Sequence, residues 1–362
     1  MPRAEPAAIL IIGEWLSQQY DEGIQNLVFS LADEWGKYGR VLLVNCGSQS
    51  VRPDWLQQGH NSIANVRTNR LFLSLPLRSA LRAFCPEMIF YVSPSCAKTT
   101  ALFRSKVLKA YAPRAKVFVV ALQPVHYSGL ERRLLPLLTP DGIFVQSPRS
   151  MELLRGLPCP VRFLPSGVDT SRFVPVAQEQ KRELRRKYEV GEGTFVVLHV
   201  GHINRKRNIQ LLQGVVQQEG VQVIIVGSTS TPQDDGLARE LAQAGVRVIR
   251  EYLPHIEELY QLADVYLFPV TSEDAAIGVP LSVLEAMACN LPVITTRFGG
   301  LPLMFQPGGG FFYFDREVEL PELIVRARAL QDCSTRRMVE PYDWRNVANM
   351  LLQMAMAGEN EP

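Results

Sequence analysis

The stretch TFVVLHVGHINRKRNIQLLQGVVQQEGVQVIIVG, residues 194–227, sets two apolar, β-branched runs on either side of a polar loop. The first run predicts a buried strand that ends at Gly201, and amphipathic helical spacing begins near Asn208. The second run predicts another buried strand. Strands that are apolar throughout and separated by helices are typical of a parallel sheet with helices on both faces.

The same alternation continues in both directions along the chain. Helical segments separate most of six earlier runs, namely AAILIIG, RVLLVNCG, MIFYVSP, AKVFVVAL, GIFVQS and VRFLPSG. After the charged helical segment EQKRELRRKYEV, the series restarts with TFVVLHVG, VQVIIVGS, VRVIREYL, VYLFPV and PVITTRF. Because 362 residues also exceed what one core usually holds, we predict two Rossmann-like α/β domains.

The domain boundary is expected near Pro175, where a polar stretch interrupts both series. The first domain would then cover residues 1–175 and the second residues 176–340. Two such domains in tandem are expected to face one another across a cleft at the carboxyl ends of both sheets. Open α/β sheets bind their ligands at such crevices, so the cleft is the expected site.

The composition is that of an ordinary globular protein, with 47% hydrophobic and 20% charged residues. No apolar run reaches about 18 residues, so no transmembrane helix is predicted. The opening MPRAEPAAILIIGEW is interpreted as a first strand rather than as a signal peptide. The 6 cysteines are scattered without a C-x-x-C pair, which favours reduced thiols in a cytoplasmic protein over a disulfide framework or a zinc site.

The charge is unevenly divided between the two halves of the chain. Residues 1–173 hold 20 Lys and Arg against 12 Asp and Glu, whereas residues 174–362 hold 18 against 24. The basic half suggests an anionic partner, such as a phosphorylated substrate or an acidic membrane surface. Solvated surface arginines account for the excess equally well.

The loop after Gly201 carries three consecutive cations, Arg205, Lys206 and Arg207. A glycine at a strand end lets the backbone approach a ligand, the following helix would supply N–H donors, and the cations would neutralise an anion. This combination indicates a phosphate site without being a Walker loop. An ordinary basic surface loop is the alternative.

A second candidate segment is DAAIGVPLSVLEAMACNLPVITTRFGGLP, residues 274–302. Pro280 suits the first turn of a short helix, which would place Glu285 near the N-terminal end of that helix. A carboxylate there could accept two hydrogen bonds from a vicinal diol, as acids do for ribose. A surface glutamate stabilised by the helix dipole is the alternative.

The segment PLSVLEAMACNLPVITTRFGGLP resembles the signature of family 4 glycosyltransferases, which are retaining nucleotide-sugar enzymes with the two-domain GT-B fold. FLPSGVDTSRFVP, VGHINRKRN and IEELYQLADVYLFPV resemble the family's pre-linker segment, its diphosphate loop and the segment leading to the donor pocket. YDWRNVANMLLQMA resembles the closing helix, which implies that residues 341–362 cross back to the first domain. The C-terminal half matches in specific motifs and the N-terminal half mainly in architecture.

The resemblance implies a role for each matching residue. Glu285 would hold the ribose hydroxyls of the donor, and Arg207, with Arg205 or Lys206, would neutralise the diphosphate leaving group. The implied glycines approach the phosphate or sugar (Gly278, Gly299, Gly300), border the nucleotide (Gly227) or lie in the covering loop of the first domain (Gly23). GT-B enzymes usually act without a metal, and the chain has no D-x-D motif, so neither metal nor cofactor is expected.

Three positions depart from the family pattern. The first glutamate of the E-x7-E pair would fall on Ile277, which cannot bind a sugar hydroxyl; Glu273 or Asp274 could reach in instead, or both could be plain loop acids. The glutamate after Gly-Gly-x-Pro is replaced by Leu303. The histidine expected after the VFVVAL strand is replaced by Gln123, and His126 follows three residues later. Either side chain could touch the donor sugar or the acceptor, or His126 could pack in its loop.

We therefore predict a GT-B hexosyltransferase that moves a sugar from a nucleotide-sugar donor to a glycan or lipid-linked acceptor with retention. A non-catalytic nucleotide-sugar-binding protein and a GT-B sugar-nucleotide epimerase are the alternatives. The expected location is cytoplasmic, with no nucleic-acid partner. The stretch RTNRLFLSLPLRSALRAF could dock the protein on an anionic membrane surface, or it could be an internal amphipathic helix.

Overall fold

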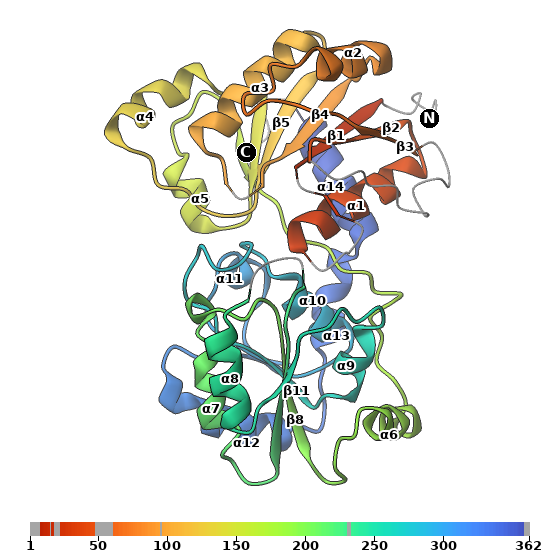
Figure 1. Cartoon of the computed structure of the whole chain (residues 1–362), viewed down its shortest axis with the longest axis vertical. Coiled ribbons are helices and arrows are strands. Elements are labelled where there is room, and N and C mark those ends of the chain that lie inside the picture. The colour runs from red at the N-terminus through yellow and green to blue at the C-terminus, as the bar shows by residue number, and fades with distance from the viewer. Residues whose placement is uncertain are drawn as a thin grey trace. The chain divides into compact units, whose positions relative to one another are not determined.

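The computed structural model describes residues 8–14, 16–17, 22–47, 61–94, 96–229 and 233–357. It contains two compact units: residues 1–165 with 344–362, and residues 166–343 (Figure 1). The expected boundaries after residues 175 and 340 lie inside the second unit. Residues 166–173 belong to that unit because Ser166 Oγ donates to the Val279 carbonyl at 2.8 Å and Arg336 Nη1 donates to the Phe173 carbonyl at 2.9 Å.

The first unit is built on a seven-stranded parallel sheet in the order β3-β2-β1-β4-β5-β6-β7. Its strands are β1 (Ile9–Gly13), β2 (Val41–Asn45), β3 (Asn61–Asn65), β4 (Met88–Val92), β5 (Lys116–Ala121), β6 (Gly142–Val145) and β7 (Val161–Phe163). Its helices are α1 (Gly23–Gly36), α2 (Leu75–Phe84), α3 (Thr99–Tyr111), α4 (Gly129–Leu134), the 3-10 turn η2 (Leu135–Leu137), α5 (Pro148–Leu153) and α14 (Trp344–Met356).

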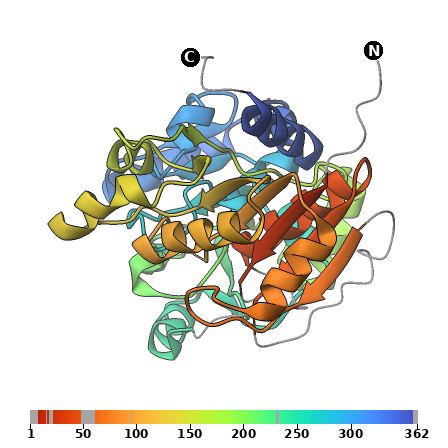
Figure 2. The ribbon, with the colours of Figure 1, turned by 90° about the horizontal axis from the view of Figure 1, so that it is seen from above.

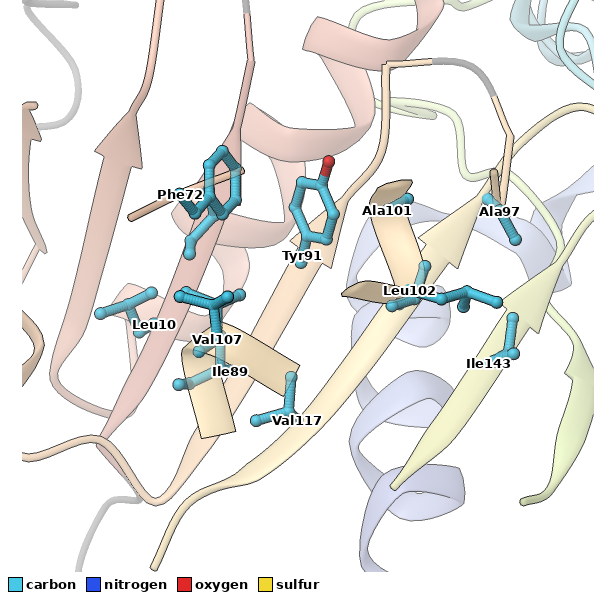
Figure 3. Packing of buried hydrophobic residues seen from close by; sticks show 14 of the residues in the cluster. Leu10, Phe72, Ile89, Tyr91, Ala97, Ala101, Leu102, Val107, Val117 and Ile143 are labelled. Atoms are coloured by element: carbon cyan, nitrogen blue, oxygen red, sulfur yellow. The ribbon is translucent and has the colours of Figure 1, made fainter. Parts of the chain in front are cut away.

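The central strands of this sheet are buried on both faces, because alternate side chains enter two different cores. Leu10, Ile89, Val117 and Ile143 pack in the core that Phe72 and Tyr91 also join, together with residues of α2 and α3 (Figure 3). On the opposite side of β4, Phe90 contacts Trp35 of α1 with ring centroids 4.8 Å apart.

The C-terminal helix α14 belongs to the first unit although the second unit precedes it in the chain. Trp35 Nε1 donates to the Ala348 carbonyl at 3.1 Å, and Arg162 Nη1 donates to the Met354 carbonyl at 2.6 Å. Val347 and Leu351 are fully buried on the inner side of the helix. The helix is therefore fastened to α1 and to β7.

The second unit is built on a six-stranded parallel sheet in the order β10-β9-β8-β11-β12-β13. Its strands are β8 (Phe195–Val200), β9 (Val221–Val226), β10 (Arg247–Ile249), β11 (Val265–Phe268), β12 (Val293–Thr295) and β13 (Phe311–Tyr313). Its α-helices are α6 (Gln178–Lys187), α7 (Leu212–Val215), α8 (Asp235–Gln243), α9 (Glu257–Leu262), α10 (Leu281–Ala288), α11 (Leu301–Met304), α12 (Leu320–Arg328) and α13 (Thr335–Val339). Its 3-10 turns are η3 (Arg205–Arg207), η4 (Ile209–Leu211), η5 (Glu317–Glu319) and η6 (Glu340–Tyr342).

The two parallel sheets with intervening helices confirm the predicted fold class. One local expectation differs: no long helix begins at Asn208, where the chain instead makes η3, η4 and the single turn α7. Asn208 itself adopts the left-handed conformation with φ 58°, which ends the first turn. None of the helices in the described part of the chain combines the length and the hydropathy that a membrane-spanning segment requires.

Candidate functional site

The carboxyl ends of β8 and β11 form the switch point of the second sheet. From β8 the sheet extends to β9 and β10 on one side, and to β11, β12 and β13 on the other. Open α/β sheets bind ligands outside the carboxyl ends of their strands at such a point. His199, near the end of β8, joins both strands here because its Nδ1 donates to the Leu267 carbonyl at 2.9 Å.

Arg207 is the buried cation of this region. Its side chain is only 8% exposed, and its Nε donates to the Ala275 carbonyl at 3.1 Å. The guanidinium lies against Gly201, where a Cβ would come within 2.0 Å of Arg207 Nη1. Gly201 is therefore required for close packing of the arginine beneath the strand end. A positive charge is thus held at the switch point in partly desolvated surroundings.

The other two cations of the loop point elsewhere. Arg205 Nη2 lies 2.6 Å from Glu240 Oε1, and Lys206 Nζ lies 2.5 Å from Asp274 Oδ2, with all four side chains exposed. The hydrogen bond from Lys206 is the main reason why the pKa of the Asp274 carboxyl is lowered. Exposed pairs of this kind contribute little to stability, because solvent screens them. The visible effect of the Lys206 pair is to engage Asp274, one of the two acids proposed to replace Ile277.

The loop before α10 is fastened to the Gly-Gly turn after β12. Gly300 N donates to the Gly278 carbonyl at 2.8 Å, and Gly299 adopts a left-handed φ of 53°. A Cβ on Gly299 would lie 2.0 Å from the Gly278 oxygen, so only glycine permits this approach. The three predicted glycines therefore meet at one place, and Arg207 holds the same loop through Ala275.

We expect Gly299→Ala to destabilise the second unit by at least about 1–3 kcal/mol, because alanine would carry both the left-handed strain and the steric conflict. Urea unfolding measures this change. Gly214→Ala in α7 is the matched control: an added Cβ meets nothing within 4 Å there, and alanine should stabilise by about 0.4–1 kcal/mol. Equal free energies of unfolding for the two variants would contradict the close approach.

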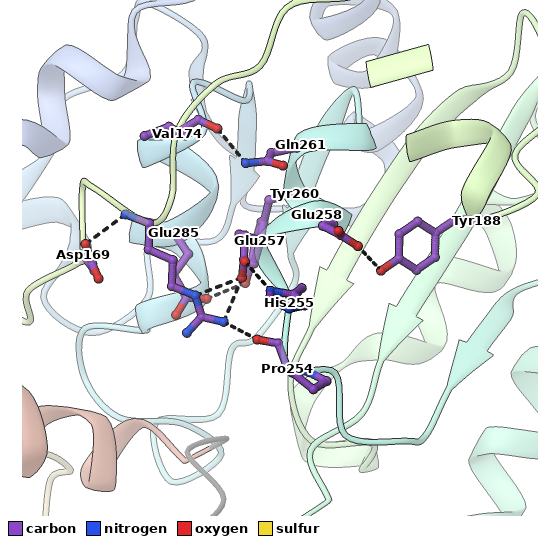
Figure 4. Close-up of polar contacts among 11 residues, drawn as sticks. Asp169, Val174, Tyr188, Pro254, His255, Glu257, Glu258, Tyr260, Gln261 and Glu285 are labelled. Carbon is purple, nitrogen blue, oxygen red and sulfur yellow. Dashed lines mark hydrogen bonds and ion pairs between the residues drawn. The ribbon is translucent and has the colours of Figure 1, made fainter. Parts of the chain in front are cut away.

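Glu285 lies in the second turn of α10, which begins at Leu281 with Pro280 as its N-cap, so the carboxylate is in the middle of this short helix and not at its N-terminal end. Its Oε2 accepts a hydrogen bond of 2.7 Å from the Tyr260 hydroxyl (Figure 4). Burial is the largest influence on the carboxyl group and raises the pKa of Glu285, while the Tyr260 hydrogen bond opposes this shift. This setting differs from that of a dipole-stabilised surface glutamate, which would be exposed.

Two tyrosines near Glu285 had no assigned role in the sequence. Tyr260 is fully buried in α9, and the Tyr266 hydroxyl of β11 donates to the Val200 carbonyl at 3.3 Å. Their rings lie 5.8 Å apart. Together they connect the end of β8 with α10, so they position Glu285 relative to the switch point. Both occupy apolar positions of their elements, which is why the sequence pattern assigns them to the core.

His199 should make the stability of the second unit depend on pH. Burial lowers the pKa of His199 to about 3, and its Nε2 is buried without a hydrogen-bond partner in the described part of the chain. In the unfolded chain the His199 imidazole takes up a proton as the pH falls through about 6.5, whereas in the folded chain it stays neutral at that pH. The stabilisation is therefore complete above pH 6.5 and is lost as the pH falls toward 3.

We expect the pH-dependent loss of stability between pH 7 and pH 5 to be about 1–2 kcal/mol smaller in His199→Gln than in the wild type. Glutamine does not titrate, and its amide can still donate to the Leu267 carbonyl. Urea unfolding at both pH values measures the difference. Parallel curves for wild type and His199→Gln would exclude a neutral buried imidazole.

Gly227 follows β9, one strand away from the switch point, and is buried. A Cβ there would come within 2.8 Å of the side-chain amide of Gln233. That amide donates to the Ser228 carbonyl and accepts from Arg250 Nε at 3.1 Å. The backbone at Gly227 is thus covered by a polar side chain.

The first unit holds two of the predicted site residues, Gly23 and His126. Gly23 is the first residue of α1, and His126 is exposed in the loop after β5 with its Nε2 3.3 Å from Arg149 Nη2. In the second unit the structure brings together Gly201, Arg207, Asp274, Gly278, Gly299 and Gly300, with Glu273 in the same loop and Glu285 on the helix that follows. Within the described residues, no group of three or more His, Cys, Asp or Glu side chains could hold a metal ion.

The second unit matches a known family model, Glycosyl transferases group 1, over residues 194–329. D-inositol 3-phosphate glycosyltransferase of Corynebacterium jeikeium is 32% identical over 165 residues, which are 41% of this chain and 38% of that protein. Alpha-maltose-1-phosphate synthase of Mycolicibacterium smegmatis is 27% identical over 222 residues, 54% of this chain and 56% of that protein. The chain thus aligns with less than two thirds of the length of these relatives.

Solved structures resemble the chain over almost its whole length. HepE of Anabaena, solved in complex with UDP and glucose, has a TM-score of 0.71 at 16% identity and covers 97% of this chain and 100% of its own. Sucrose-phosphate synthase of Thermosynechococcus elongatus has a TM-score of 0.73 at 19% identity, with coverage of 97% and 98%. At these identities the similarity establishes the fold, which is the GT-B fold.

Proposed function

We propose that the chain transfers a sugar from a nucleotide-sugar donor to an acceptor, with retention of configuration, because its residues 194–329 match the model of the Glycosyl transferases group 1 family. The observation that carries this proposal is the buried Arg207 at the switch point of the second sheet, next to the loop that ends in the Gly278–Gly300 contact. The names of the aligned relatives and the UDP and glucose bound by the Anabaena structure support the donor class.

The proposed reaction makes its largest demand on the leaving diphosphate, which gains negative charge as the glycosidic bond breaks. Arg207 would neutralise that charge, and it is held in position before the ligand arrives. The backbone amides around Gly278 and Gly299 would contact the phosphate or the sugar. Glu285 would accept hydrogen bonds from the ribose hydroxyls. The acceptor hydroxyl would attack on the leaving-group side and pass its proton to the departing diphosphate, without a covalent intermediate on the protein.

The replacement of the family glutamate by Ile277 shifts sugar recognition to other groups. Asp274 is engaged by Lys206, so we propose the half-buried Glu273 and the backbone of the loop as the sugar contacts. The same replacement favours a second candidate, a protein that binds nucleotide sugars without turning them over. Donor hydrolysis and transfer distinguish the two, because a binder would keep its affinity and show neither.

A panel of nucleoside diphosphates and nucleotide sugars, screened by thermal unfolding, tests the donor site. A ligand at a hundredfold excess over its Kd stabilises the native state by about 2.7 kcal/mol. We expect at least one nucleoside diphosphate and its sugar to stabilise the protein, and the sugar to be released or transferred on incubation. No stabilisation by any nucleotide in the panel would refute the proposal.

The acceptor is proposed to be a glycan or lipid-linked molecule bound by the first unit. The excess of cations in residues 1–173 supports an anionic acceptor or its membrane environment. A lipid-linked acceptor would require the enzyme to act at a membrane surface without spanning it.

A further inference from the structure

Six exposed leucines lie on the first unit in two groups. Leu71, Leu73 and Leu75 precede or begin α2, and Leu130, Leu134 and Leu137 belong to α4 and η2. Leu75, Leu130 and Leu137 are 74%, 70% and 71% exposed. Among the described residues of both units, these six make up half of the 12 exposed large hydrophobic side chains. Isolated exposed leucines are common, but a concentration of this size on one part of a surface needs an explanation.

The two leucine groups lie on either side of α3. The helices α2, α3 and α4 cover the same face of the first sheet, because the crossovers from β3 to β4, from β4 to β5 and from β5 to β6 all run in one direction along the sheet. Arg104 Nε of α3 donates to the Arg70 carbonyl at 2.8 Å, and Thr99 Oγ1 donates to Glu131 Oε1 of α4 at 2.9 Å. Figures 1 and 2 show the three helices next to one another on the outer side of the unit.

The leucines face outward because the inward positions are already occupied. Leu77 and Leu81 of α2 are fully buried in the core of the first unit, so the helix itself is internal and amphipathic. The exposed leucines lie before it or on its first residue. The helix α4 has no buried residue. In the described part of the chain, the core of the first unit therefore leaves no open apolar position into which these exposed leucines could turn.

The charge around these leucines has one sign. Residues 67–138 contain 12 Lys and Arg but only 2 Asp and Glu, whereas the whole chain is nearly balanced at 38 against 36. One of the two acids, Glu131, is engaged in the capping box of α4 and with Thr99. The exposed cations of the segment near the leucines are Arg67, Arg70, Arg82, Lys98, Lys106, Arg132 and Arg133. We call these cations and the six leucines the leucine–arginine face.

We infer that the leucine–arginine face docks on an anionic lipid bilayer. Leucines interleaved with arginines are what an interfacial membrane contact uses: the apolar side chains enter the headgroup boundary while the cations meet anionic lipids. The apolar groups are divided by the basic helix α3 rather than joined at one centre. Protein partners usually engage a central packed cluster, whereas an extended bilayer can contact both groups at once. This inference rests on exposed side chains, and it adds to the proposed function that the protein acts at a membrane surface.

Vesicle co-sedimentation of the full chain, without donor or acceptor, tests the inference. We expect binding to vesicles of phosphatidylcholine with phosphatidylglycerol at low salt, weaker binding at high salt, and little binding to phosphatidylcholine alone. Leu73→Gln/Leu75→Gln/Leu130→Gln/Leu137→Gln should weaken binding at least about tenfold. Arg82→Gln/Arg132→Gln/Arg133→Gln should weaken it roughly a hundredfold, since each cation near the surface contributes about a factor of five.

The matched control changes exposed apolar side chains of the second unit. Val318→Gln/Val325→Gln should bind vesicles as the wild type does, since both side chains are exposed outside the leucine–arginine face. No binding of the wild type to anionic vesicles, or equal binding by the leucine variant and the control, would overturn the inference. Loss of a concentration-dependent dimer in the leucine variant without any change in vesicle binding would assign the face to a second copy instead. The nucleotide-induced thermal shift should persist in every variant, so that failure of the docking inference and failure of the donor site remain distinguishable.

Discussion

Arg207→Ala should lower the rate of donor hydrolysis or sugar transfer by about a hundred- to a thousandfold. Removing one preorganised group that stabilises the charge of a transition state has an effect of this size. Arg207 is the buried member of its loop, and its guanidinium is held between Gly201 and the Ala275 carbonyl. Steady-state kinetics with the donor found in the nucleotide panel measures the loss, and nucleoside diphosphate binding should weaken in parallel.

Arg205→Ala is the matched control for Arg207→Ala. Arg205 carries the same charge two positions earlier but pairs with Glu240 on the exposed surface, so activity should change little. Arg207→Lys tests the hydrogen bond to Ala275 separately, because lysine keeps the charge but not the geometry of the guanidinium. Thermal unfolding without ligand identifies any variant that loses its fold. Equal losses of activity in Arg205→Ala and Arg207→Ala would refute the assignment to a buried phosphate-binding arginine.

The sequence predicted the interior strands of both sheets, because these strands are apolar on both faces. The strands that it missed, β3 and β13, lie at the edges of their sheets. The β3 residues NSIAN are only partly buried, and β13 has three residues. The other two edge strands, β7 and β10, were predicted because their runs are β-branched and apolar. An edge strand has one neighbour and needs less apolar surface, so a polar edge strand such as β3, or a very short one such as β13, carries too little signal to be found.

The basic loop was predicted as one phosphate-binding group, but its three cations have separate positions. A 3-10 helix has three residues per turn, so consecutive side chains point in three different directions. Arg205, Lys206 and Arg207 form such a turn and meet Glu240, Asp274 and Ala275 respectively. The composition of the loop shows where the cations are. Which of the three is buried depends on the 3-10 conformation of the backbone, and the sequence pattern does not reveal that conformation.

The two tyrosines that position Glu285 could not be predicted from the sequence either. Tyr260 occupies an apolar position of α9 and Tyr266 an apolar position of β11, where phenylalanine would give the same periodic pattern. Their hydroxyl groups become informative only when the Glu285 carboxylate and the Val200 carbonyl are brought next to them by tertiary folding.

Glu285→Gln should separate donor binding from stability. Burial raises the pKa of Glu285. The folded state therefore loses stability as the pH rises above the ordinary pKa of a glutamate, because the carboxylate must ionise in buried surroundings. Glutamine removes that charge and can still accept from the Tyr260 hydroxyl. We therefore expect the unfolding temperature without ligand to be equal to or above that of the wild type at pH 7. Donor affinity should fall by about one to two orders of magnitude, because charge-assisted hydrogen bonds to the ribose are lost.

Tyr260→Phe distinguishes a binding role of Glu285 from a purely structural one. It removes the hydroxyl that donates to Oε2 at 2.7 Å but leaves the carboxylate in place. If Glu285 binds ribose, Tyr260→Phe should lower donor affinity less than Glu285→Gln does, while lowering the unfolding temperature more. Thermal unfolding with and without the nucleoside diphosphate measures both quantities in one experiment. A full ligand-induced shift in Glu285→Gln would mean that the carboxylate serves only the packing of α9 against α10, and the donor site would then have to be assigned to other residues.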